Sequence, residues 1–228
     1  MGYLLLAGGA EFGGRMAEPD RLAMSLAGGP GATISIIPAA AAPDNNHIRA
    51  GRNGVDWFRG LGAFHVSALP LIDHTSANHP DIVKILEKSR LIYLLGGFPR
   101  HLAQSLAGTR GWQAMVAAYE AGAVIAGSSA GAMVLCEHYY DPTSTQVFNG
   151  LNLVKGICVL PHHDTFGHTW APPLAKQLLD ITLIGIDEET GAIFDTANSR
   201  WQASGKGCIT LYRDNKIETF SAQEQFVL

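Results

Sequence analysis

Short apolar runs alternate with segments of helical periodicity through the first part of the chain. Continuous apolar runs of strand length predict buried strands, and they lie at residues 3–7, 33–38, 63–69, 91–95 and 123–126. Apolar positions at helical spacing predict helices between them, at residues 16–27, 46–61, 81–88, 99–107 and 112–120, with one more after Ser129. This alternation is typical of a parallel sheet covered by helices.

The pattern becomes less regular after Cys136. Residues 138–149 have no strong period and are expected to form a loop, whereas residues 156–161 predict a strand and residues 172–183 a helix. Brief strands are expected at residues 184–186 and 192–194, and the runs GCITLYR and KIETFS around Asp214-Asn215 predict an antiparallel hairpin at one edge. The predicted fold is α/β, a three-layer, doubly wound, mostly parallel sheet with helices on both faces.

The stretch AGAVIAGSSAGAMVLC contains the pattern G-x-S-x-G between a predicted strand and a predicted helix. This pattern is typical of a nucleophile elbow, in which small neighbours let the chain reverse sharply and leave a serine hydroxyl exposed. Ser129 is therefore a candidate nucleophile, and the backbone N–H of Ala130 is a candidate oxyanion donor. A tight turn with a serine at a helix N-terminus would have the same sequence. The motif alone leaves both interpretations open.

A serine nucleophile needs a base and an acid that orients the base. His163 follows a predicted buried strand, and His162 would point to the opposite side if that strand continued. Asp187 and Glu188 follow another short strand, so they should reach the same edge of the sheet. Asp141, after the nucleophile helix, would instead give the chain order of ordinary α/β-hydrolases. Two sets remain open at this point: Ser129, His163 and Glu188, or Ser129, Asp141 and His163.

Composition and charge narrow the class of protein. The chain has 228 residues, 47% of them hydrophobic, and no obvious linker, so a single domain over residues 1–228 is expected. The net charge is −4 without a basic cluster, which argues against nucleic acid or membranes as partners. No apolar run is long enough for a signal peptide or a membrane span, and a cytoplasmic protein with reduced cysteines is expected.

Metal and cofactor sites are only weakly supported. The glycine-rich segment GGAEFGG matches neither a dinucleotide-binding motif nor a phosphate-binding loop. The cluster of His162, His163, Asp164 and His168 lacks the H-E-x-x-H spacing of a zinc site. We therefore expect no cofactor and no metal.

Several stretches together resemble the dipeptidase E and cyanophycinase group of serine peptidases, which share the class I glutamine amidotransferase-like fold. They are LLLAGGAE, LIYLLGGFPRHL, AGSSAGAMVL, the histidine after ICVLPH, and IGIDEETGAI. The resemblance implies that Ser129 is the nucleophile and that His163 is the base, with His162 as the alternative. It implies Glu188 as the acid in the cyanophycinase branch and Asp141 in the dipeptidase branch. The implied oxyanion donors are the N–H groups of Gly97 and Ala130.

The substrate is less well defined than the reaction. Both branches cut bonds beside aspartate, but here the double glycine is followed by Phe98-Pro99, and Arg100 is the nearest candidate for holding a carboxylate. Phe98 and Trp170 would instead form a more apolar pocket. We expect a serine peptidase that acts on short peptides or isopeptide-like amides, and a homodimer is suggested by the resemblance alone. The alternatives are an esterase and a non-catalytic ligand-binding domain; glutamine amidotransfer requires a cysteine at the elbow.

Overall fold

A computed structural model describes residues 2–196, 198–214 and 216–228. Its largest sheet has eight strands in the order β14-β11-β10-β1-β5-β4-β2-β3. The strands are β1 (Tyr3–Ala7), β2 (Thr33–Ile37), β3 (His65–Ala68), β4 (Leu91–Leu94), β5 (Val124–Ser128), β10 (Thr190–Asp195), β11 (Arg200–Gly205) and β14 (Gln225–Phe226). The five strands from β1 to β3 in this order are mutually parallel, and β10, β11 and β14 add antiparallel pairs.

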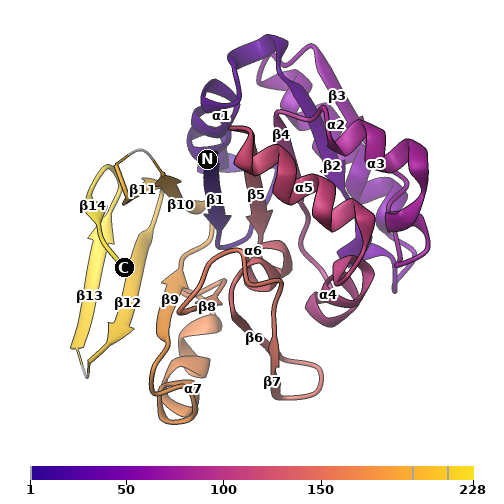
Figure 1. Ribbon diagram of the computed structural model, residues 1–228. Helices are drawn as coiled ribbons and strands as arrows, with labels where there is room; N and C mark the ends of the chain where they lie inside the picture. The colour runs from indigo at the N-terminus through magenta and orange to yellow at the C-terminus, as the bar shows by residue number, and fades with distance from the viewer. Residues whose placement is uncertain (1, 197, 215) are drawn as a thin grey trace.

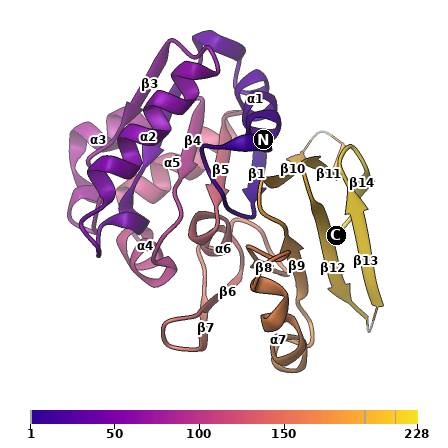
Figure 2. The same cartoon turned by 180° about the vertical axis from the view of Figure 1, so that it is seen from behind.

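Helices cover both faces of this sheet because alternate strand residues enter different cores. Leu4 and Leu6 of β1 belong to one core cluster, and Leu5 between them belongs to the other. The second cluster is covered by α1 (Ala17–Leu26) and α2 (His47–Gly60). The first is covered by α3 (Pro80–Leu86), α4 (Pro99–Leu106), α5 (Arg110–Glu120) and α6 (Ala130–Leu135). In Figure 1, α5 lies in front of the sheet, and the opposite view in Figure 2 brings α2 to the front. The predicted fold class is confirmed.

A second sheet is built from later parts of the chain. Its order is β13-β12-β9-β8, with β8 (Ile157–Leu160) parallel to β9 (Thr182–Ile186). The predicted hairpin is present as β12 (Cys208–Arg213) and β13 (Lys216–Ser221), and residue 215 of its turn lies outside the described residues. The hairpin joins β9, so it extends this second sheet rather than the large parallel one. The yellow strands stand beside the main sheet in Figures 1 and 2.

Two predicted elements differ from the structure. The expected loop at residues 138–149 contains an antiparallel pair, β6 (His138–Asp141) and β7 (Gln146–Asn149), whose many polar residues concealed the strand pattern. The predicted helix at residues 172–183 is shorter, because α7 (Ala171–Gln177) ends where Leu178 leaves helical geometry and β9 begins at Thr182. Short 3₁₀ turns lie at Gly14–Met16, Gly29–Gly31, Ala39–Ala41, Ser76–Asn78 and Gly167–Trp170.

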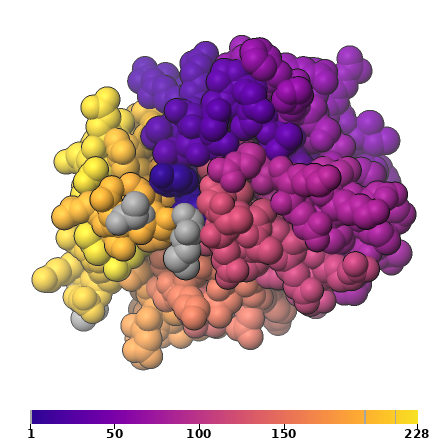
Figure 3. Space-filling view, turned by 45° about the horizontal axis from the view of Figure 1, so that its top comes forward, coloured from indigo at the N-terminus to yellow at the C-terminus, as the bar shows by residue number. Residues whose placement is uncertain are grey.

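The two sheets share one buried cluster. Leu6 and Ala192 of the main sheet belong to the same core as Ile186, Ile209 and Leu211 of the second sheet. In the space-filling view of Figure 3, the C-terminal strands in yellow pack directly beside the indigo N-terminal segment. Within the described ranges, no helix is both long enough and apolar enough to cross a membrane.

Candidate active site

Ser129 lies at the sharp turn between β5 and α6. Its backbone angles are φ 49° and ψ −113°, a strained combination for a residue with a side chain. Its N–H donates to the Ala7 carbonyl over 2.9 Å, and its carbonyl accepts the Met133 N–H over 3.0 Å. A side chain at Gly131 would place its first carbon 2.2 Å from the Leu94 oxygen, so only glycine fits there. The turn therefore has the geometry of a nucleophile elbow.

The structure brings the hydroxyl of Ser129 to the ring of His162. The Ser129 Oγ lies 3.0 Å from His162 Nε2, and His162 Nδ1 lies 2.7 Å from Glu188 Oε1. In the arrangement that this network favours, Nδ1 carries a proton and donates to the carboxylate, which leaves Nε2 free to accept from the serine hydroxyl. These three side chains form a serine, imidazole and carboxylate chain of the kind used in acyl transfer.

His163, which we expected to face the serine, lies elsewhere. Its Nε2 is 2.9 Å from the Tyr212 hydroxyl, and its Nδ1 is 3.4 Å from Asp187 Oδ1. The structure therefore does not bring His163 to the serine, although its place after a buried strand and the family resemblance led us to expect it there. The strand ends at Leu160, and His162 has a positive φ of 50°, which turns its side chain toward the serine. Burial lowers the pKa of His163, and the neighbouring Asp187 opposes that shift.

The three candidate acids have different hydrogen-bond partners. Glu188 contacts His162, whereas Asp187 pairs with His163 and accepts the Cys208 N–H over 2.8 Å. Asp141 is buried at the end of β6, where its carboxylate accepts hydrogen bonds from Thr143 and Ser144 of the following turn. The order Ser129, Asp141 and His163, which would mark an ordinary α/β-hydrolase, therefore has no counterpart in the geometry.

The loop after β1 supports the imidazole of His162. Gly9 has a φ of +127°, and a first side-chain carbon there would lie 2.2 Å from His162 Cε1. The His162 N–H donates to the Gly8 carbonyl over 2.7 Å, and the Phe166 ring stacks on the imidazole with centroids 5.0 Å apart. Sequence reasoning missed these contacts, although the double glycine directly after a buried strand was a visible sign of close backbone approach.

The Gly96-Gly97 turn lies beside the serine at the end of β4. A side chain at Gly96 would place its first carbon 3.3 Å from Ser129 Cβ, and one at Gly97 would lie 2.3 Å from the Ala40 oxygen. Glu11 accepts the Gly96 N–H over 3.0 Å, and the Ala40 carbonyl accepts the Phe98 N–H over 2.8 Å. The two N–H groups on either side of Gly97 are therefore both engaged, which fixes the peptide that contains the Gly97 N–H.

Phe98, Arg100 and Trp170 are the residues that we expected to contact the substrate. Phe98 is 40% exposed, directly after the double glycine. The Arg100 guanidinium lies 4.9 Å from the centre of the Phe148 ring, a cation–π contact, so an aromatic ring and not a carboxylate is its neighbour here. Trp170 packs on Phe166, which in turn stacks on His162. The rings of Trp170, Phe166 and His162 thus form an aromatic row that begins next to α7.

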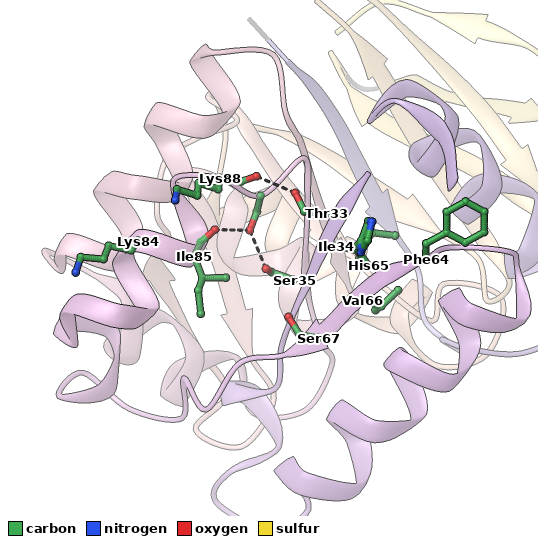
Figure 4. A pocket seen from close by; sticks show the side chains of 11 residues that line it. Thr33, Ile34, Ser35, Phe64, His65, Val66, Ser67, Lys84, Ile85 and Lys88 are labelled. Atoms are coloured by element: carbon green, nitrogen blue, oxygen red, sulfur yellow. Dashed lines mark hydrogen bonds between the residues drawn. The ribbon is translucent and has the colours of Figure 1, made fainter. Parts of the chain in front are cut away.

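Other cavities and clusters lie away from this group. A cavity of about 540 Å³ is lined by β2, β3 and α3, with hydrogen bonds from Thr33 to the Lys88 carbonyl and between Ser35 and Ser89 (Figure 4). Neither the elbow nor the double glycine contributes to it. In the described part of the chain, no group of three or more histidine, cysteine or acidic residues is arranged to hold a metal ion.

Comparisons with known proteins identify the family of the chain. A model of peptidase family S51 matches residues 4–197. Similar curated relatives are a cyanophycinase from Synechococcus elongatus, 27% identical over 92% of this chain and 67% of the relative, and one from Geminocystis herdmanii, 28% identical over 91% and 79%.

Two solved structures are also similar to the chain. One is a peptidase from an acI-B1 Actinobacterium, with a TM-score of 0.86 at 28% identity over 100% of this chain and 97% of that one. The other, a putative peptidase E protein from Listeria monocytogenes, shares the fold with a TM-score of 0.60 at 19% identity, over 96% of this chain and 98% of that one.

Proposed function

The chain belongs to peptidase family S51 and is a serine-type peptidase, and from this premise we propose that it hydrolyses amide bonds of short peptides through Ser129, His162 and Glu188. The observation that carries the proposal is the continuous hydrogen-bonded chain from the Ser129 hydroxyl through His162 to Glu188. Its two distances, 3.0 Å and 2.7 Å, lie within the reach that proton transfer requires.

The proposed reaction starts with attack of Ser129 Oγ on the substrate carbonyl carbon. His162 Nε2 takes the hydroxyl proton, and Glu188 stabilises the imidazolium that forms. The carbonyl oxygen becomes an oxyanion, which the backbone N–H groups of Gly97 and Ala130 would bind. His162 then protonates the leaving amine, and a covalent acyl-serine remains. Water, activated by the same imidazole, releases the acid and restores Ser129.

Replacing Ser129 with alanine tests the nucleophile. Ser129→Ala is expected to abolish labelling by a fluorophosphonate probe and to reduce turnover of short peptides by about 10⁴-fold or more, since acyl transfer needs the hydroxyl. Circular dichroism should remain that of the wild type, because the change removes one oxygen atom at a turn. A variant that keeps full turnover would exclude Ser129 as the nucleophile.

Variants at the two candidate histidines and at two of the candidate acids test the partners of Ser129. His162→Gln and Glu188→Gln should each reduce kcat by about 10³-fold or more, whereas His163→Gln and Asp141→Asn should change it by less than about 10-fold. The comparison is sharp because His162 and His163 are adjacent and differ only in what they contact. If the His163→Gln protein lost activity and the His162→Gln protein kept it, His163 and not His162 would be the base.

A further inference from the structure

The strand β3 lies at one end of the main sheet and leaves its outer edge unpaired. Among the described strands it pairs only with β2, in parallel register. The Leu69 N–H donates to the Ile36 carbonyl over 2.9 Å. In a parallel ladder this alternation directs the backbone N–H and C=O groups of Val66 and Ala68 away from β2. The sequence of β3, HVSA, contains no proline, lysine or acidic residue, which protect many edge strands. A further strand can therefore pair with this edge.

Two cavities flank this edge, one on each face of the sheet. The cavity of about 540 Å³ lies on the face of α3, where Thr33, Ser35 and Ser67 line it (Figure 4). Ile34 and Val66, which alternate with them, enter the core cluster that α2 covers. A second cavity, of about 630 Å³, lies on the face of α2, and its apolar lining residues are Ile48, Val55, Ala68, Leu69, Pro70 and Ile72. A strand paired with β3 would send alternate side chains toward the two cavities.

The residues around the two cavities carry an excess of positive charge. Lys84 and Lys88 line the first cavity, and Arg52 and Arg59 line the second. Asp56, which pairs with Arg52 over 3.6 Å, is the one carboxylate among the described residues that line them. Lys84, Lys88 and Arg59 form none of the ion pairs found in the described part of the chain. The protein as a whole carries a net charge of −4, so this edge is a basic region of an acidic protein.

Large apolar side chains are exposed at the same edge. Ile48 is 76% exposed, Phe64 72% and Ile85 43%, and each of them lines one of the two cavities. Apolar side chains that lie singly on a surface need no partner. Because these three gather around one unpaired strand, they favour a surface that a partner covers.

We propose that the outer edge of β3 binds an extended segment of a partner protein in which acidic and apolar residues alternate. Backbone hydrogen bonds to Val66 and Ala68 would hold the segment. Its acidic side chains would face Lys84 and Lys88 across the first cavity, and its apolar side chains would enter the second. A second copy of the chain fits less well, because antiparallel pairing of two β3 strands would bring the lysines of both copies to the same face. No residue of the proposed catalytic group lines either cavity.

Binding of a fluorescein-labelled peptide, Val-Glu-Val-Asp-Val-Glu-Val, measures this recognition by fluorescence anisotropy. The same peptide with lysine at its three acidic positions should bind at least about 10-fold more weakly, because its charges meet the cations of the edge. Two further peptides carry N-methyl groups either on the acidic residues or on the inner valines. Alternate amides of an added strand face β3, so only one of these two peptides should lose binding. Equal binding of the two methylated peptides, or of the acidic and lysine peptides, would overturn the inference.

Ala68→Pro tests the strand edge in the protein. It removes an N–H that points away from β2 and places a ring there, so the pairing with β2 is retained. Binding of the acidic peptide should fall at least about 10-fold, while circular dichroism stays that of the wild type. A folded Ala68→Pro protein with wild-type affinity would contradict the inference. If this variant failed to fold, the methylated peptides would still test the same hydrogen bonds on the wild-type protein.

The protein with both Lys84→Glu and Lys88→Glu tests the charge. It should bind the acidic peptide at least about 10-fold more weakly, because attraction becomes repulsion. Lys176→Glu is the matched control, since Lys176 is exposed on α7, and its affinity should stay within about 2-fold of the wild type. Unchanged affinity after both lysines are reversed would exclude the acidic partner.

Sedimentation velocity distinguishes a partner segment from a second copy. Ala68→Pro should leave the oligomeric state of the protein unchanged, because the proposed occupant of the edge is another protein. A wild-type dimer that Ala68→Pro separates would assign the edge to a second copy and overturn the inference.

Discussion

The carboxylate of Asp20 in α1 is buried, and only one of its two oxygens accepts a hydrogen bond among the described residues. It is 0% exposed, and the Trp57 indole N–H donates to its Oδ2 over 2.8 Å. Its second oxygen, the Tyr93 hydroxyl and the Ser128 hydroxyl are buried, and none of these atoms has a hydrogen-bond partner at normal distance among the described residues. Burial raises the pKa of Asp20 to about 7. The ionised form is therefore disfavoured in the folded protein.

This carboxylate should make stability depend on pH. Between the unfolded pKa of about 4 and the folded pKa of about 7, the folded state holds a proton that the unfolded state has lost, so the free energy of unfolding falls as pH rises. Between pH 5 and pH 8 the loss would be about 3 kcal/mol, since about two pH units of this window lie in that range. Asp20→Asn keeps an acceptor for Trp57 and should remove this dependence. Urea unfolding at pH 5 and pH 8 measures the difference.

The lowered pKa of His163 acts in the opposite direction, because a histidine that resists protonation when folded adds stability as pH rises through about 6.5. Both proteins retain His163, so the difference between wild type and Asp20→Asn isolates the carboxylate. Identical pH slopes for the two proteins would contradict the assignment.

Residue types predicted the elbow serine better than the histidine that it contacts. The glycines and alanines around Ser129 indicate a sharp turn from the sequence alone, since the reversal leaves no room for larger side chains. The choice between His162 and His163 depended on a single backbone angle, the positive φ of His162, which no side-chain pattern encodes. Each histidine also has its own acid, Glu188 or Asp187, so a neighbouring carboxylate could not distinguish them.

At the scale of elements, the turn between β4 and α4 depends on one glycine. Gly97 has a φ of +136°, and a side chain there would meet the Ala40 backbone at 2.3 Å. Gly97→Ala should shift the peptide that carries the proposed oxyanion donor and lower kcat by about 10²-fold or more. Gly122→Ala is the control, because Gly122 also has a positive φ but nothing lies within 4 Å of the added carbon.

Both glycine variants introduce backbone strain, and only one alters the site. Gly122→Ala should lose about 1 kcal/mol of stability and keep its kcat, whereas Gly97→Ala should lose activity beyond any loss of stability. Steady-state kinetics together with urea unfolding separate the two effects. Equal kcat values for the two variants would remove Gly97 from the proposed oxyanion hole.

The strands of the parallel sheet were predictable because their apolar runs are buried on both faces. The hairpin of β6 and β7 was not, since polar residues such as His138, Gln146 and Asn149 interrupt the apolar pattern of its strands. The end of α7 was also missed, because Leu178, Leu179 and Ile181, which lie between the helix and β9, continue a helical spacing by coincidence.

At the scale of the whole molecule, the two sheets should unfold together. Leu211 of β12 is 0% exposed and belongs to the cluster that contains Leu6 of β1. Leu211→Ala should lower the free energy of unfolding by about 2 to 5 kcal/mol in one transition seen alike by circular dichroism and tryptophan fluorescence. The exposed Ile217→Ala, on the neighbouring strand β13, should change it by less than about 1 kcal/mol.

Coincident transitions would support a single domain over residues 1–228. An early, separate transition of the second sheet in Leu211→Ala would contradict it and would divide the chain into two folding units.

The serine and its partners are supplied by different sheets, which has a consequence for the order of folding. The elbow is complete once β1, β4 and β5 have paired, all within the first 135 residues. His162 and Glu188 instead follow β8 and β9, whose parallel pairing requires a crossover through α7. A refolding chain should therefore regain helical ellipticity before it regains reactivity toward fluorophosphonates. Stopped-flow circular dichroism and timed labelling would detect a nearly native intermediate in which Ser129 does not yet contact His162 and does not react with the probe.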